Sequence, residues 1–106
     1  MSIQDNWFVV RALRNGNIEI EAGEKDGECV AGMSVYADAD EKKAVRYLCQ
    51  HRQGTTQYGV TTYRKLKVLS NFRIRESFEG KNIGHYLIDG ITEKEAKNAF
   101  SNYKDV

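Results

Sequence analysis

Four thiol and imidazole side chains could support metal binding or nucleophilic chemistry in this chain: Cys29, Cys49, His51 and His85. Structural zinc sites use close ligand pairs on turns. Cys49 and His51 instead lie two residues apart on a predicted helix, where their side chains diverge by about 200°. We therefore expect no metal site, and no motif indicates a bound cofactor.

Nucleophilic catalysis would require Cys or Ser beside a base that a third group orients. His51 is explained by its position at the end of a predicted helix, where the helix dipole favours a cation. His85 alternates with Ile83 and Leu87, a pattern typical of a partly buried histidine on a strand. The sequence thus predicts a protein that is not an enzyme. A small enzyme or ligand-binding domain stays open as a third interpretation, which a polar pocket around His85 would favour.

The charge distribution is the most unusual feature of the sequence. Residues 1–41 hold nine acids and three bases, a net charge of −6, and residues 76–106 hold six acids and four bases, a net charge of −2. Residues 42–75 hold nine bases and no acid. A stretch of one sign this long indicates a polyanion or an acidic protein as partner. Its bases are Lys42, Lys43, Arg46, Arg52, Arg64, Lys65, Lys67, Arg73 and Arg75.

The expected strand register gathers part of this charge on one surface. If Leu66 and Val68 share the core face with Phe72 and Ile74, a short hairpin places the intervening lysines and arginines together on the other face. A two-residue turn at residues 79–80 would then place the aromatic ring of Tyr86 beside Arg73. The cations would contact phosphates and the ring would stack on a base. The predicted binding residues are Lys43, Arg46, Arg64, Lys65, Lys67, Arg73, Arg75 and Tyr86.

Several functional interpretations follow from this surface. The first is a non-catalytic module that binds nucleic acid through a basic β-hairpin. The alternative is a protein-interaction module that regulates or inhibits a larger complex, including a nucleoprotein complex of the kind that phages and mobile elements encode. Its acidic N-terminal and basic central faces would also suit an acidic protein partner or a homo-oligomer. Compensation of the basic face within the molecule, by Glu19, Glu21 and neighbouring acids, is equally consistent with the sequence.

The first half of the chain predicts three strands followed by a helix. Asn15-Gly16 is a strong signal for a tight hairpin turn. Asp38 or Asp40 can cap the following helix, whose apolar stripe includes Val45, Leu48 and Cys49. Gly54 can end it in a left-handed conformation. The expected strands span residues 7–14, 17–22 and 29–36, with a turn at 24–27, and the helix follows residue 40.

The second half predicts the same plan. Strands are expected over residues 56–68, 71–78 and 82–88, and Thr92 to Glu95 forms a capping box before a helical stripe that extends to Tyr103. At a shift of 52 residues the two capping positions, Asp40 and Thr92, coincide. The sequence therefore predicts a single α+β domain over residues 1–106. It would contain a mostly antiparallel sheet and two helices in the order β-β-β-α-β-β-β-α, with a pseudo-repeat of 7–54 and 55–104.

The predicted location is cytoplasmic. No apolar run approaches the ~20 residues of a membrane span, and the N-terminal residues lack the layout of a secretory signal. Two cysteines far apart do not form a disulfide framework.

Residues 93–99, Glu-Lys-Glu-Ala-Lys-Asn-Ala, are similar to the start of the second helix of double-stranded RNA-binding domains. The predicted order of helix, three strands and helix over residues 40–103 also matches that family. The chain departs from it at three points. Glu93-Lys94 replaces a lysine pair, a Gly-Pro-x-His loop has no counterpart, and three strands precede the first helix. We therefore infer no membership.

Overall fold

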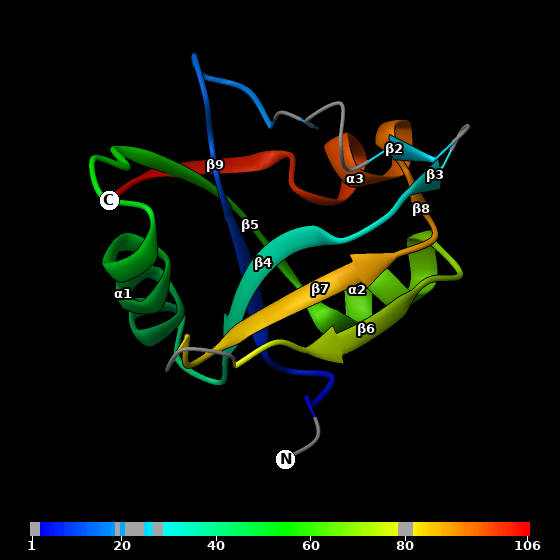
Figure 1. Ribbon diagram of the computed structural model, residues 1–106, viewed down its shortest axis with the longest axis horizontal. Coiled ribbons are helices and arrows are strands. Elements are labelled where there is room, and N and C mark those ends of the chain that lie inside the picture. The colour runs from blue at the N-terminus through cyan, green and yellow to red at the C-terminus, as the bar shows by residue number, and fades with distance from the viewer. Residues whose placement is uncertain (1–2, 19, 21–24, 27–28, 79–81) are drawn as a thin grey trace.

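The computed structural model describes residues 3–18, 20, 25–26, 29–78 and 82–106. Its centre is a six-stranded sheet in the order β6-β7-β4-β1-β5-β9, in which every pair is antiparallel (Figure 1). The predicted α+β class with a mostly antiparallel sheet is thus confirmed. The strands are β1 (Phe8–Ala12), β4 (Met33–Asp38), β5 (Gln57–Thr62), β6 (Arg73–Glu76), β7 (His85–Asp89) and β9 (Asn102–Asp105).

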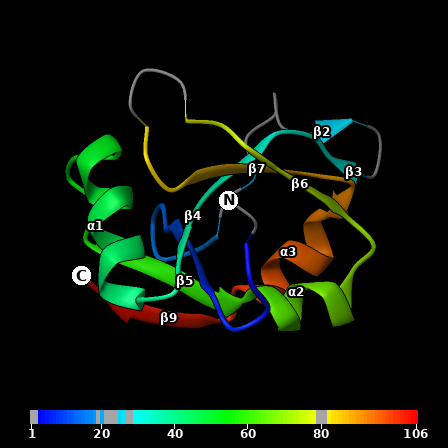
Figure 2. The same cartoon turned by 90° about the horizontal axis from the view of Figure 1, so that it is seen from below.

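Helices cover both faces of this sheet. In Figure 2, α1 lies on one side of it, and α2 and α3 lie together on the other. A small antiparallel sheet, β2-β3-β8, joins the region of α3. These elements are α1 (Glu41–His51), α2 (Tyr63–Leu69), α3 (Glu93–Ala99), β2 (Lys25–Asp26), β3 (Cys29–Val30) and β8 (Ile91–Thr92).

Helix α1 forms where the sequence predicted it. The side chain of Asp40 accepts a hydrogen bond from the backbone N–H of Lys42 at 2.9 Å and so caps the helix. Ala44 and Leu48 are buried against Val10 of β1 and its neighbours. The opposite side of the helix consists of charged and polar residues that face solvent.

The larger core lies on the other face of the sheet, beneath α2 and α3. Phe100, Leu66 and Ile88 are fully buried there. The predicted capping box of α3 is present, because the Thr92 hydroxyl accepts from the Glu95 N–H and the Glu95 carboxylate accepts from the Thr92 N–H. Ala96 and Ala99 of α3 are buried in this core.

Helix α2 replaces the end of a predicted strand, so the described residues hold three helices where the sequence analysis expected two. The strand prediction for residues 56–68 is correct only as far as Thr62. The Thr62 hydroxyl then accepts from the Lys65 N–H at 3.2 Å and starts a helix. Leu66 is buried at the centre of that helix, and Tyr63 and Leu69 pack against the core at helical spacing. The β-favouring residues before Tyr63 concealed this signal.

The second half of the chain therefore has a different element order from the first. Residues 55–104 contain β5, α2, β6, β7, β8, α3 and the start of β9, which is neither three strands and a helix nor the order of the double-stranded RNA-binding domains. The caps Asp40 and Thr92 do coincide at the shift of 52 residues. However, α3 ends at Ala99, and Tyr103 lies on the edge strand β9 rather than on a helical stripe.

The other predicted strands are shorter or interrupted. Asn15 and Gly16 adopt the positive φ angles of the predicted hairpin turn, at 52° and 78°, and Arg14 and Asn17 form a bridge across it. The predicted strand 29–36 divides into β3 and β4 around Gly32, whose φ is 70°. The predicted turns at 24–27 and 79–80 lie partly or wholly outside the described residues, as do parts of strand 17–22.

A membrane-crossing helix is not found among the described residues, since none combines the necessary length and apolar character.

Candidate functional site

The structure does not gather the eight predicted binding residues on one surface. Lys43 and Arg46 lie on α1, which covers one face of the sheet. Helix α2, on the opposite face, holds Arg64, Lys65 and Lys67. The edge strand β6 holds Arg73 and Arg75, and β7 holds Tyr86. The predicted basic hairpin was wrong because residues 63–69 are helical, so Lys65 and Lys67 do not project from a strand opposite β6.

Tyr86 lies in the core and does not join the arginines of β6. The register pairs Arg73 with Asp89 and Glu76 with Tyr86, which differs by three residues from the register of a two-residue turn. A shift by an odd number reverses the face. Tyr86 is 3% exposed and its ring meets Phe78 edge-on, so the predicted stacking of this ring on a base at the Arg73 surface was wrong.

Asp5 compensates part of the positive charge of α2. Its carboxylate accepts a hydrogen bond from the Lys67 ammonium at 2.5 Å, and that hydrogen bond lowers the pKa of Asp5. The Lys67 ammonium also lies 5.0 Å from the centre of the Tyr63 ring. Arg64 adds its own positive field to the same carboxylate. The α2 surface is therefore less cationic than its sequence indicates.

Asp89 compensates part of the positive charge of β6. Its carboxylate accepts from the Arg75 Nε at 2.9 Å and from the Gly32 N–H at 2.6 Å. The Arg75 hydrogen bond is the main reason that the pKa of Asp89 is lowered, while burial opposes it. Among the described residues, internal compensation thus comes from Asp5 and Asp89. The predicted partner Glu19 and most of the other N-terminal acids lie outside the described residues.

The outward side of α1 keeps its positive charge. Lys42, Lys43 and Arg46 are exposed, and no ion pair links Lys43 or Arg46 to an acid within the part of the chain that the structure describes. Glu41, the single acid of α1, is drawn toward the edge of the sheet, where it accepts hydrogen bonds from Tyr58 at 2.6 Å and from Lys104.

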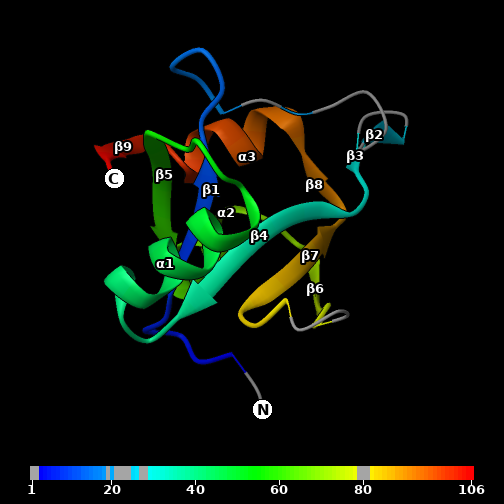
Figure 3. The ribbon, with the colours of Figure 1, turned by 60° about the vertical axis from the view of Figure 1, so that its left-hand side comes forward.

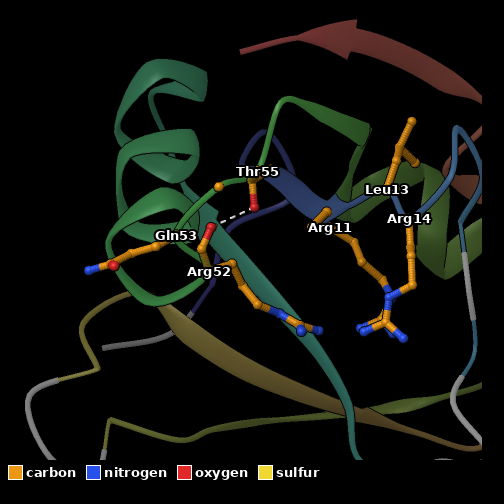
Figure 4. A pocket seen from close by; sticks show the side chains of 8 residues that line it. Arg11, Leu13, Arg14, Arg52, Gln53 and Thr55 are labelled. Atoms are coloured by element: carbon orange, nitrogen blue, oxygen red, sulfur yellow. Dashed lines mark hydrogen bonds between the residues drawn. The ribbon is translucent and has the colours of Figure 1, made fainter.

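A pocket with three arginines lies beside the C-terminal end of α1. It has a volume of about 190 Å³, and Arg11, Arg14 and Arg52 line it together with Leu13 and Thr55. Figure 4 shows the Arg11 and Arg14 side chains extending in the same direction, with Arg52 reaching toward them from the helix side. We call this the arginine pocket. Guanidinium groups suit it to an anion that accepts planar, bidentate hydrogen bonds.

Local backbone geometry places each arginine. Strands β1 and β4 pair as far as Val10 and Tyr36. Beyond this pair, Arg11 Nη1 donates to the Ser34 carbonyl at 2.6 Å, which fixes a side chain that is 4% exposed. Arg14 begins the exposed hairpin turn. Arg52 caps α1 through its backbone N–H, and its carbonyl accepts from the Thr55 hydroxyl at 2.6 Å.

A hydrogen-bonded serine and histidine lie next to the arginine pocket. His85 Nδ1 is 3.0 Å from the Ser77 carbonyl, and Nε2 is 2.5 Å from the Ser34 hydroxyl. Because a carbonyl only accepts, Nδ1 carries the hydrogen and the Ser34 hydroxyl donates to Nε2. Burial lowers the pKa of His85, and the positive fields of His51 and Arg52 lower it further, against the opposing Ser77 hydrogen bond. The imidazole is therefore held neutral.

The part of the sheet that no described helix covers continues this surface. In Figure 3, α1 stands in front of β1 and β5, with β4, β7 and β6 extending to the side. Register places Ser34 beside Leu87, and Leu87 beside Arg75, on that face. The Tyr36 ring, on the same face, stacks on His51 at 5.8 Å and tilts against His85 at 5.1 Å.

The arginines of the pocket are not among the predicted binding residues. Arg52 directly follows α1, and Arg11 and Arg14 fall within the expected strand 7–14. Nothing in their spacing indicates that they converge on one pocket. Within the described residues, no group of three or more His, Cys, Asp or Glu side chains could hold a metal ion, and Cys29 and Cys49 are free thiols.

Comparison with protein-family models, with curated proteins and with solved structures finds no match for this chain.

Proposed function

We propose that this protein is a non-catalytic nucleic-acid-binding module that binds the phosphate backbone with α1 and the arginine pocket. The observation that supports this most strongly is the convergence of Arg11, Arg14 and Arg52 on one pocket beside a helix whose outward cations have no acidic partner among the described residues. Phosphate contacts provide most of the affinity of such modules.

The dimensions of this surface suit a strand of nucleic acid. Lys43 and Arg52 are nine residues apart, which corresponds to about 14 Å along a helix axis. Phosphates along one strand of a duplex recur every ~3.4 Å of its axis. The outward side of α1 and the arginine pocket could therefore contact several phosphates of one strand together. This surface takes the place of the predicted basic hairpin in the proposal, because Asp5 and Asp89 offset part of the positive charge of α2 and β6.

A matched pair of double variants tests this proposal. Lys43→Ala with Arg46→Ala removes two charges from α1, and Arg64→Ala with Lys65→Ala removes two from α2. Fluorescence anisotropy with single-stranded and duplex oligonucleotides at low salt should show at least about tenfold weaker binding for the α1 variant. The α2 variant should bind within about twofold of the wild type. Equal losses in both variants, or a wild type that binds no oligonucleotide, would contradict the proposal.

The exposed edge of the sheet favours the second candidate, a protein-interaction module that regulates or inhibits a larger complex. Strand β9 pairs with β5 on one side, and no described strand pairs with its other side. All four of its residues are exposed, and Tyr103 is 41% exposed. Such an edge can accept a strand from a partner or from a second copy. Light scattering after size exclusion, with a pull-down from native lysate, distinguishes this candidate by a stable protein complex that retains no nucleic acid.

For either candidate we propose a cytoplasmic location. Support comes from two cysteines that remain free thiols in the fold.

A further inference from the structure

We infer that two copies of this chain pair through the open edge of β9, so that the sheet of one continues into the sheet of the other. Strand β9 ends the sheet beside β5, and no described strand lies on its other side. All of its residues are exposed, and Val106 directly after it is 60% exposed. The inference goes beyond the proposed function, because this pairing requires no nucleic acid.

The hydrogen bonds to β5 determine which backbone groups of β9 face outward. The Val106 N–H donates to the Thr56 carbonyl at 2.9 Å. Hydrogen-bonded and non-hydrogen-bonded pairs alternate along an antiparallel ladder, so every second residue back from Val106 directs its N–H and C=O groups toward β5. The residues between them, Tyr103 and Asp105, direct theirs to the open side. The hydrogen bonds from β1 reach the alternate residues of β5, as the same phase requires.

Charge selects one register for pairing with a second copy. Outward backbone groups pair only with one another, so odd-numbered residues of β9 must face odd-numbered residues. A symmetric register centred on Lys104 or on Asp105 places that charge directly opposite itself, which destabilises the pair. A register centred before Tyr103 brings the end of α3 against the second strand. The register centred on Tyr103 avoids these conflicts and places Ser101 opposite Asp105 and Asn102 opposite Lys104.

The other edge strand, β6, has no comparable register. Its ladder with β7 turns the backbone groups of Ile74 and Glu76 outward. A self-pairing centred on Ile74 would place Arg73 opposite Arg75. One centred on Arg75 or on Glu76 would pair that residue with its own copy. Each of these registers puts like charges directly opposite, which is a common protection of sheet edges against association. The charge pattern therefore favours β9 as the edge that self-associates.

The pairing would place both α1 helices on the same face of one continuous sheet. The two-fold axis of a symmetric antiparallel pair is perpendicular to the sheet, so each face continues into the same face of the second copy. Glu41 of α1 binds Lys104 at 3.0 Å, so α1 begins close to β9 (Figure 1). This ion pair also offsets the charge of Lys104, whose copy lies diagonally across the pairing. Both outward sides of α1 would then face one nucleic acid.

Analytical ultracentrifugation over a range of protein concentrations, without nucleic acid, tests the inference. Ser101→Lys places a cation opposite Asp105 and should tighten the dimer at least about twofold, because symmetry applies the change twice. Ser101→Asp places like charges opposite and should weaken it by a similar factor. As matched controls, Val68→Lys and Val68→Asp alter an 81% exposed side chain of α2 and should leave the dimer unchanged. A wild type that stays monomeric at all concentrations, or Ser101 variants that do not shift in opposite directions, would overturn the inference.

Disulfide cross-linking tests the register. The background carries Cys29→Ser and Cys49→Ser, which remove both free thiols. Tyr103→Cys should form a covalent dimer on oxidation, because the Cα atoms of a hydrogen-bonded pair lie about 5.5 Å apart, within the range of a disulfide. Lys104→Cys should not, because diagonal neighbours lie about 7–8 Å apart. A Lys104→Cys variant that cross-links as fast as Tyr103→Cys, or no cross-link in either, would contradict the register.

The inference and the proposed function fail separately. A protein that binds oligonucleotides but stays monomeric overturns the inference and leaves the function in place. A dimer that responds to Ser101 as expected but binds no oligonucleotide supports the inference and contradicts the function. A monomer that uses β9 to hold a different protein would assign this edge to that protein, and the inference would again be overturned.

Discussion

The Ser34 hydroxyl donates to Nε2 of His85 across 2.5 Å, while His85 Nδ1–H donates to the Ser77 carbonyl at 3.0 Å. The two hydrogen bonds connect β4, β7 and the segment after β6, and they require a neutral imidazole. Protonation would leave Nε2–H facing the Ser34 hydroxyl in a region that His51 and Arg52 already make positive. This pair therefore links the stability of the sheet beside the arginine pocket to pH.

Stability should fall as the pH decreases from about 7.5 to 5.5. The pKa of His85 is lower in the folded protein than its ordinary 6.5, so the unfolded chain binds the proton more readily. The stabilisation from neutral His85 is complete above the unfolded pKa and is lost as the pH falls toward the folded one. Urea denaturation at several pH values measures it. In His85→Gln the dependence over this window should flatten, whereas His51→Gln should keep most of it, because burial of His85 is the main cause of the lowered pKa. An unchanged profile in His85→Gln would refute the assignment.

Gly84→Ala should destabilise the protein more than Gly16→Ala. Both glycines have positive φ, 80° and 78°, so both variants pay a conformational cost of about 1–2 kcal/mol. A Cβ at Gly84 would also lie 2.4 Å from the Tyr47 ring on α1, whereas one at Gly16 meets nothing within 4 Å. Overpacking adds about 1–3 kcal/mol. Thermal unfolding of the two variants compares the costs, and similar melting temperatures would mean that α1 does not pack closely against Gly84.

Tyr58→Phe should lower the free energy of unfolding by about 1 kcal/mol. Its hydroxyl donates to Glu41 at 2.6 Å, and Lys104 donates to the same carboxylate. Burial and the Glu41 carboxylate together raise the pKa of Tyr58 to about 12. Burial also raises the pKa of Tyr36 and of Tyr86, so ultraviolet titration should show a late-ionising group of tyrosines that loses one member in Tyr58→Phe. An unchanged late-ionising group in that variant would contradict the assignment to Tyr58.

The local signals in the sequence were sufficient for several elements of the fold. Asp40 and Thr92 cap helices as predicted, because a cap depends on only four consecutive residues. Asn15-Gly16 forms its turn for the same reason. Within the expected strand 17–22, Ile18 and Ile20 alternate with Asn17 and Glu19 in the sequence, and both isoleucines are buried.

Features that depend on distant contacts could not be predicted in this way. Helix α2 forms where Leu66 enters a core shared with Phe100, 34 positions along the chain, although the preceding residues favour a strand. The register of Tyr86 depends on the length of the connection from residue 77 to residue 84, and a two-residue turn was the wrong assumption. Arg11 is buried because the pairing of β1 with β4 ends at Val10 and its side chain then reaches the Ser34 carbonyl. No local sequence pattern indicates where that pairing ends.

The dependence of nucleic-acid affinity on salt tests the central claim most directly. Each phosphate contact contributes about 0.7–0.9 to the slope of log affinity against log salt concentration. If α1 binds the backbone, Lys43→Ala with Arg46→Ala should reduce the magnitude of that slope by about 1.5, and Arg64→Ala with Lys65→Ala should leave it at the wild-type value. A wild-type affinity independent of salt, or a slope reduced only by the α2 substitutions, would contradict the account.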